Sequence, residues 1–252
     1  MAEPTFLKTP QGRNIACHRT EGTGPGVVFL IGYRSDMDGT KCLFLEDWAR
    51  RTGRAFLRFD YSGHGQSDLS IDQTDPQMWA EDALAVLDAM TEGPQVLVGS
   101  SLGGWMSMVV AARRLERVAG LVTIAAAPDF TEGIYHHRMS DAQRAEFEAT
   151  GRTMMSETDF GSPDYFTHAQ FEGGKAVSVL SQPFSIEGPV RLLQGTQDEA
   201  VGRDTLLQLV DHIDCPDLRM SLVKGADHRF SDPDCLALIL RETEDVLSRV
   251  GG

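Results

Sequence analysis

QVLVGSSLGGWM, residues 95–106, places a serine between two glycines, directly after an apolar run and directly before a helix-like one. Gly99, Ser101 and Gly103 spell G-x-S-x-G, a pattern that in this context predicts a sharp strand-to-helix turn. A β-carbon at either glycine would collide with neighbouring backbone in such a turn. The turn also sets Ser101 at a helix N-terminus, where free N–H groups favour a developing negative charge. Ser101 is therefore the candidate nucleophile.

Short apolar runs alternate with segments of helical spacing on both sides of this turn. Strands are predicted at residues 26–32, 55–62, 95–100, 118–128, 189–195 and 218–226, after an opening hairpin of 5–9 and 13–19. Helices are predicted at about 40–52, 76–91, 101–115, 202–212 and 232–249. Near-continuous apolar strands are typical of parallel sheets covered on both faces. We therefore expect one α/β domain over residues 1–252, with a mostly parallel central sheet of about eight strands and helices on both faces.

Residues 131–188 interrupt this alternation, because they are charged, rich in methionine and aromatic residues, and hold no convincing buried strand. A connection of this length inside a compact domain is usually functional. We interpret it as a small, partly helical insert that forms a lid. The alternative is a surface excursion with no part in binding.

The bulk composition excludes several classes of protein. A formal net charge of −14, with no lysine- or arginine-rich run, argues against a nucleic-acid partner or an anionic membrane surface. The N-terminus lacks a targeting pattern, and no apolar run is long enough to span a bilayer. The four cysteines show neither C-x-x-C pairing nor zinc-site spacing. We expect a cytoplasmic protein with reduced thiols.

A serine nucleophile requires a base within hydrogen-bond reach and an acid that orients the base. In a sheet of this kind both should follow the serine, in loops at the carboxyl ends of later strands. Asp198 and His228 each follow a predicted strand, in that order, and are the candidate acid and base. Asp129 and Asp227 remain alternatives for the acid. The other histidines are interpreted as structural or surface residues: His18, His64, His136, His137, His168 and His212.

An oxyanion hole needs two donors aimed at the developing alkoxide. The backbone N–H groups of Leu102, after the nucleophile, and of Tyr33, after the strand at 26–32, are the candidates. Arg34 is interpreted as a solvated charge paired with Asp36, with contact to an anionic substrate group as the alternative. The loop at 60–67 lacks both the P-loop lysine and dinucleotide-fold spacing, so we interpret it as a structural turn.

Together these residues resemble the α/β-hydrolase superfamily over essentially the whole chain. The resemblance is carried by the D-x-x-G-x-G-x-S loop of residues 60–67, the turn around Ser101, and Asp198 and His228 in the expected order. The stretches GYRSDMDGTK, PVRLLQGTQDE and DHR look closer still to an acyl-protein thioesterase branch of that superfamily. The chain departs from that branch at Ile31, where the branch has proline, and at Gln194, where it has histidine. Residues 131–188 match it less well.

The resemblance implies a serine hydrolase that cleaves carboxylic thioesters or esters through an acyl-enzyme on Ser101. It implies no metal or organic cofactor, and a small-molecule or S-acylated peptide or protein substrate. The alternatives are a cofactor-free perhydrolase and a non-catalytic binder that retains the fold. Thioester and ester hydrolysis would use the same residues.

Overall fold

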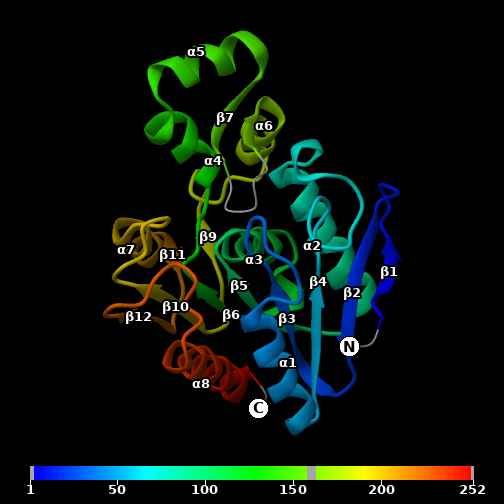
Figure 1. The fold of residues 1–252 in the computed structure, drawn as a ribbon. Helices are drawn as coiled ribbons and strands as arrows, with labels where there is room; N and C mark the ends of the chain where they lie inside the picture. The colour runs from blue at the N-terminus through cyan, green and yellow to red at the C-terminus, as the bar shows by residue number, and fades with distance from the viewer. Residues whose placement is uncertain (1–2, 158–162, 251–252) are drawn as a thin grey trace.

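The structure is a computed structural model that describes residues 3–157 and 163–250. Eight strands form its central sheet: β1 (Thr5–Lys8), β2 (Asn14–Thr20), β3 (Thr23–Leu30), β4 (Arg54–Phe59), β5 (Gln95–Ser100), β6 (Val118–Ile124), β10 (Val190–Gly195) and β12 (Leu218–Val223). Their order across the sheet is β1-β2-β4-β3-β5-β6-β10-β12 (Figure 1). The pairs β1–β2 and β2–β4 are antiparallel, and every other pair is parallel.

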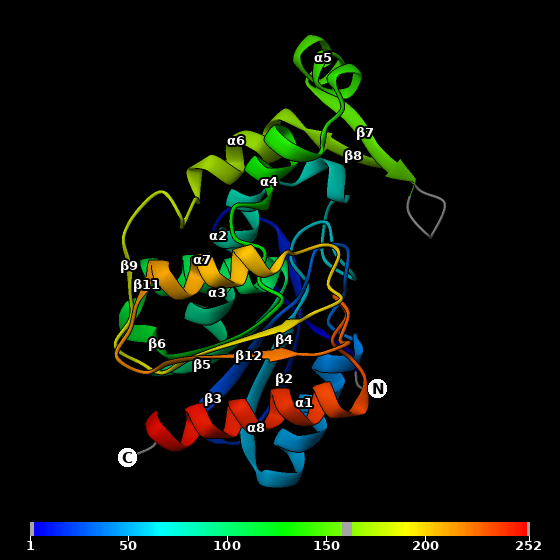
Figure 2. The same cartoon turned by 90° about the vertical axis from the view of Figure 1, so that its left-hand side faces the viewer.

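Helices cover both faces of this sheet, as Figure 2 shows. The helices α1 (Thr40–Thr52) and α8 (Pro233–Val250) lie on one face, and α2 (Pro76–Met90), α3 (Leu102–Arg113) and α7 (Arg203–His212) lie on the other. Short 3-10 turns occur at η1 (Ile71–Gln73) and η2 (Leu115–Arg117). The predicted α/β-hydrolase architecture is confirmed. None of the helices in the described ranges has the length and apolar character that a membrane crossing requires.

Local sequence explains the positions of these elements. Every residue of β5 is buried, as expected for a strand covered on both faces. Helix α2 begins with Pro76, and the Asp75 side chain accepts a hydrogen bond from the Met78 N–H at 2.9 Å. Helix α1 ends at Gly53, whose φ of 69° is left-handed.

The insert lies over the carboxyl ends of the central strands (Figure 1). It contains α4 (Phe130–Gly133), the π-helical turn η3 (Ile134–Arg138), α5 (Asp141–Thr150), β7 (Arg152–Glu157), β8 (Pro163–Thr167) and α6 (His168–Ala176). A small core of its own, made of Met139, Phe147, Phe166 and Phe171, holds these elements together. Near the end of the 131–188 segment, β9 (Phe184–Ser185) pairs with β11 (Ile213–Asp214). Residues 158–162 of the predicted insert lie outside the described residues.

Two expectations about the strands were wrong. The insert was expected to be partly helical and to hold no convincing buried strand, yet β7 and β8 form an antiparallel hairpin. Phe166 of β8 packs into the insert's own core, and this tertiary contact stabilises a hairpin whose strands lack the long apolar runs of the central sheet. The strand predicted at 118–128 ends at Ile124, because Ala125 has a φ of 48° and turns the chain into a loop. The apolar run continues past the strand into the site.

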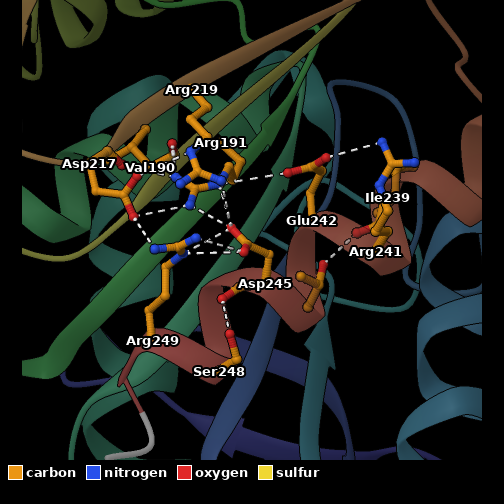
Figure 3. A network of polar contacts seen from close by, with 11 residues as sticks. Val190, Arg191, Asp217, Arg219, Ile239, Arg241, Glu242, Asp245, Ser248 and Arg249 are labelled. Atoms are coloured by element: carbon orange, nitrogen blue, oxygen red, sulfur yellow. Dashed lines mark hydrogen bonds and ion pairs between the residues drawn. The ribbon is translucent and has the colours of Figure 1, made fainter.

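A network of ion pairs joins β10, β12 and α8 at one edge of the sheet, with Arg191 at its centre (Figure 3). The Arg191 side chain is 1% exposed, and its Nε donates to Asp245 at 2.8 Å while its Nη2 donates to Asp217 at 3.1 Å. Arg249 contacts the same two carboxylates, at 3.0 Å and 3.3 Å. The network ties the amino-terminal ends of β10 and β12 to α8, at the opposite end of these strands from the loops with Asp198 and His228.

Replacing Arg191 by leucine should destabilise the fold because it leaves these carboxylates without their central partner. We expect Arg191→Leu to lower the free energy of unfolding by about 1 to 3 kcal/mol, less than for a fully buried pair because both carboxylates keep some contact with water. Arg219→Leu, at the half-exposed rim of the same network, is the matched control and should cost less than about 1 kcal/mol. Urea unfolding measures both. Equal midpoints for the two variants would contradict the central position of Arg191.

The same network gives the stability a pH dependence of known sign. The hydrogen bond from Arg249, opposed by partial burial and aided by Arg191, lowers the pKa of Asp245 to about 2. An unfolded aspartate has a pKa of about 3.9, so this stabilisation is present above that pH and is lost as the pH falls toward 2. Urea midpoints of the wild type should fall between about pH 4 and pH 2, and those of Arg191→Leu should fall less steeply.

Candidate active site

Ser101 lies at the tip of the turn between β5 and α3. Its φ of 55° and ψ of −114° are strained for a residue with a side chain, and its N–H donates to Ile124 O at 2.8 Å. The first helical N–H groups of α3 point toward this tip. The sequence prediction of a strained serine at a helix N-terminus matches the backbone.

The two glycines of the pentapeptide are required by close backbone contacts. A β-carbon at Gly99 would lie 2.2 Å from Gly103 O, and one at Gly103 would lie 2.0 Å from Leu30 O. Real β-carbons do not approach backbone atoms so closely, so α3 can pack against β5 and β3 only with glycine at both positions. The glycines thereby set where Ser101 stands.

His228 lies between Ser101 and Asp198. Its Nε2 is 3.1 Å from Ser101 Oγ, and its Nδ1 is 2.9 Å from Asp198 Oδ2. The Asp198 side chain is fully buried, whereas the His228 side chain keeps 33% of its surface exposed. The structure thus brings the three predicted residues into the geometry in which a base can take a proton from a serine hydroxyl.

The loops that carry Asp198 and His228 are joined by backbone contacts. Gln197 N–H donates to Ala226 O at 2.9 Å, and a β-carbon at Gly195 would lie 2.1 Å from the same oxygen. Because β10 and β12 are parallel neighbours, their carboxyl ends meet at the same edge. This contact explains how residues 30 positions apart come within hydrogen-bond distance.

Asp198 is held as a carboxylate by several donors. Burial alone would raise its pKa, but the hydrogen bonds from His228, from the Val201 N–H at 2.8 Å and from Gln194 Nε2 at 2.7 Å lower the pKa below its usual value. An ionised carboxylate can orient the imidazole and stabilise its charged form. Gln194 was noted only as a departure from the thioesterase branch, and its hydrogen bond to Asp198 was not predicted.

The candidate oxyanion donors flank Ser101 on two elements. Leu102 is the first residue of α3, and Tyr33 follows Gly32, whose β-carbon would lie 3.6 Å from Ser101 Cβ. Within residues 3–157 and 163–250, no acceptor is found for the N–H group of either Leu102 or Tyr33. Both donors are therefore available beside the serine hydroxyl.

The expected pairing of Arg34 with Asp36 was wrong. Arg34 instead pairs with Asp164 of β8, its Nη2 lying 2.8 Å from Asp164 Oδ1. Asp36 Oδ1 accepts from the Asp38 N–H at 2.9 Å. A left-handed backbone at Arg34, with a φ of 56°, accompanies this contact with the insert, which no local pattern could indicate.

The other candidates have structural partners of their own. Asp129 accepts from Ser178 Oγ at 2.6 Å and from the Val179 N–H at 3.0 Å, so it ties the two ends of the insert together. Asp227 Oδ1 accepts from the Phe230 N–H at 3.1 Å. In the loop at 60–67, Asp60 accepts from the Met37 and Gln66 N–H groups, as expected for a structural turn.

Two hollows border the insert. An open groove of about 960 Å³ is bounded by the loop after β6, the end of the insert and the start of α7. An enclosed cavity of about 20 Å³ lies between the insert and the loop after β3, and its volume suits at most a single water. Phe130 lines both hollows, and Ala127 of the groove donates its N–H to Ser101 O at 3.2 Å. The groove is the larger of the two and meets the Ser101 backbone through Ala127, although no side chain of the triad is among its lining residues.

Comparison with known proteins identifies the fold and the family. A family model described as alpha/beta hydrolase fold matches residues 27–158. The chain belongs to the α/β-hydrolase family, and it is a hydrolase by fold and by relatives.

Individual relatives match nearly the whole chain. It is 34% identical over 248 residues to the rat protein named palmitoyl-protein thioesterase ABHD10, mitochondrial, covering 98% of this chain and 83% of the rat protein. The solved structure of alpha/beta hydrolase domain-containing protein 10 from mouse has a TM-score of 0.90 at 34% identity, covering 98% of this chain and 99% of the mouse chain. A putative hydrolase from Agrobacterium vitis S4 has a TM-score of 0.91 at 34% identity, with 97% and 98% covered.

Proposed function

We propose that this α/β-hydrolase cleaves thioesters and carboxylic esters through an acyl-enzyme on Ser101, with S-acylated peptides or proteins as its preferred substrates. One observation carries the chemistry: His228 bridges Ser101 Oγ and the buried Asp198 carboxylate at 3.1 Å and 2.9 Å. Relatives named palmitoyl-protein thioesterase support the preference for S-acyl substrates. The unpaired cysteines fit a reducing compartment such as the cytoplasm.

The proposed reaction has two stages, acylation and deacylation of Ser101. Ser101 Oγ attacks the acyl carbonyl carbon while His228 Nε2 takes the hydroxyl proton, and the N–H groups of Tyr33 and Leu102 stabilise the resulting oxyanion. The tetrahedral intermediate collapses with cleavage of the bond to sulfur or oxygen, and the imidazolium protonates the leaving group. Water, deprotonated by His228, then attacks the acyl-enzyme, and the second tetrahedral intermediate collapses to a carboxylic acid while His228 returns the proton to Ser101 Oγ. Asp198 holds the imidazole in the required tautomer throughout.

The open groove is the proposed site for the long acyl chain. Its volume of about 960 Å³ lies in the range of sites that bury sizeable ligands, whereas the enclosed cavity holds almost no free space. Apolar side chains at Ala127, Phe130 and Leu180 line it, and Ala127 is hydrogen-bonded to the Ser101 backbone. Because α4 and the end of α6 form one wall, we propose that the insert acts as a lid that selects the acyl group.

Gly133 gives a matched test of this acyl site. It lines the groove in helical conformation, and a β-carbon there meets no atom within 4 Å. We expect Gly133→Trp to fill the groove and to lower kcat/KM for an S-palmitoyl peptide by about tenfold or more, because the chain loses its apolar contacts. Turnover of an S-acetyl peptide should stay unchanged, and Gly133→Ala should leave both substrates unaffected.

An activity panel tests the proposed function itself. Hydrolysis rates are measured for S-acyl peptides and for p-nitrophenyl esters of graded chain length. Each substrate is assayed with the wild type and with Ser101→Ala. Ser101-dependent turnover with a preference for long S-acyl peptides supports the proposal. Equal rates on short oxygen esters would contradict the S-acyl preference, and a wild type with neither turnover nor fluorophosphonate labelling would indicate a binder.

A further inference from the structure

A single carboxylate in the insert, Asp164, accepts hydrogen bonds from Tyr33 and Arg34, which lie after β3. Asp164 Oδ1 accepts from Arg34 Nη2 at 2.8 Å, from Arg34 Nε at 3.1 Å and from the Tyr33 hydroxyl at 3.3 Å. About three quarters of both the Arg34 and the Asp164 side-chain surface is shielded from water. Two consecutive residues of the oxyanion loop are thus tied to one atom that lies 130 positions away in the chain.

These hydrogen bonds restrain a stretch of backbone that belongs to no helix or strand. Tyr33 and Arg34 lie after the end of β3, and Arg34 has a left-handed φ of 56°. A side-chain tether is one way to keep such a conformation in place. The Tyr33 ring is also enclosed by Trp79 and Phe130, with ring centroids 5.8 Å and 5.7 Å away. The side chain is therefore fixed at its ring and at its hydroxyl.

Little water surrounds the hydrogen bonds of Asp164 with Tyr33 and Arg34. Tyr33 and Asp164 both line the enclosed cavity of about 20 Å³, so almost no water separates the insert from the oxyanion loop there. Burial, aided by the negative charge of Asp164, raises the pKa of Tyr33 to about 12, so the phenol remains a hydrogen-bond donor at neutral pH. Charge-assisted hydrogen bonds are stronger where water is excluded.

From these contacts we infer that Asp164 is a positioning residue: through Tyr33 and Arg34 it holds the Tyr33 N–H in place to receive the oxyanion. The inference rests on the proposed function, because an oxyanion forms only if Ser101 attacks an acyl carbonyl. It gives the insert a second part in the reaction, besides lining the acyl groove. Asp164 itself touches no reacting atom.

Asp164→Asn tests this position, because the amide keeps the size of the side chain and removes its charge. A misplaced oxyanion donor should lower kcat by about ten- to thirtyfold on both thioesters and short esters, while KM changes by less than about twofold. Affinity for a trifluoromethyl ketone, which forms a tetrahedral adduct, should fall in the same proportion. Asp164→Glu, which keeps the charge, should recover part of the rate. Asp141→Asn, an exposed carboxylate on the same insert, is the control and should leave kcat unchanged.

A double-mutant cycle with Arg34→Gln and Asp164→Asn shows whether Asp164 acts through Arg34. If it does, Arg34→Gln and Asp164→Asn have non-additive effects on kcat, and the double variant is no slower than the slower single variant. Additive losses, an unchanged kcat in Asp164→Asn, or a loss only in KM would each overturn the inference. A fall in melting temperature with no change in inhibitor affinity would also overturn it, since it shows a purely structural contact. If the wild type itself turned over no ester or thioester, the proposed function would fail instead.

Discussion

Ser101→Ala should reduce kcat for thioester and ester hydrolysis by about 10⁴- to 10⁶-fold, the range expected when a serine nucleophile is removed. The loss follows from the geometry, because no other hydroxyl occupies the position 3.1 Å from His228 Nε2 among the described residues. The melting temperature should not fall, because alanine at a φ of 55° is strained to about the same degree as serine. Steady-state kinetics and thermal unfolding on the same preparation measure both effects.

Ser100→Ala is the matched control for this variant. Ser100 is the last residue of β5, is 6% exposed, and sits one position before the nucleophile. Its replacement should change kcat by less than about threefold, because the turn is shaped by Gly99 and Gly103. A comparable loss in Ser100→Ala would show that activity is lost through damage to the turn, which would weaken the assignment of Ser101.

Asp198→Asn should produce the second largest loss, about 10⁴-fold in kcat. An asparagine amide can donate to His228 Nδ1, which favours the tautomer with a proton on Nε2. That tautomer cannot take the proton from Ser101 Oγ. KM should change little, because Asp198 is buried and does not face the substrate. Measuring kcat of Asp198→Asn and of the wild type as a function of pH distinguishes the loss of the group that orients His228 from misfolding of the loop.

Two neighbouring variants make the test of Asp198 specific. Asp227→Asn alters the carboxylate next to His228 but keeps an oxygen for the Phe230 N–H, so it should retain nearly full activity. Gln194→Leu removes one of the donors to Asp198 and should lower kcat by about tenfold, the value of one hydrogen bond to a charged group. If Asp129→Asn, and not Asp198→Asn, abolished turnover at an unchanged melting temperature, the acid would be misassigned.

The layered fold is predictable from the sequence because short local patterns indicate its strands and helices. Apolar runs bounded by glycine or proline indicate the strands, and the G-x-S-x-G turn indicates how β5 passes into α3. Strand ends were less predictable, as at Ala125, because an apolar loop that enters the site has the same composition as a buried strand. The β7–β8 hairpin was missed because its stability comes from the aromatic core of the insert.

Some residues of the candidate site were predictable from the sequence, and others depend on tertiary contacts. Ser101, Asp198 and His228 were identified from their loop positions, since the carboxyl ends of parallel strands converge at one edge. The partner of Arg34 was not, because Asp164 lies in a segment whose packing on the oxyanion loop depends on tertiary contacts across 130 residues. The role of Gln194 was not predicted either, because only the folded loop shows that its amide reaches Asp198.

Mass spectrometry of a rapidly quenched reaction tests the central claim most directly. Wild-type protein is mixed with an excess of an S-palmitoyl peptide, quenched with acid during the first turnover, and digested. We predict one palmitoyl group on the peptide that contains Ser101, formed and lost at rates compatible with steady-state turnover, and absent from Ser101→Ala. Turnover without this adduct, or an adduct on a cysteine that persists in Ser101→Ala, would contradict the account.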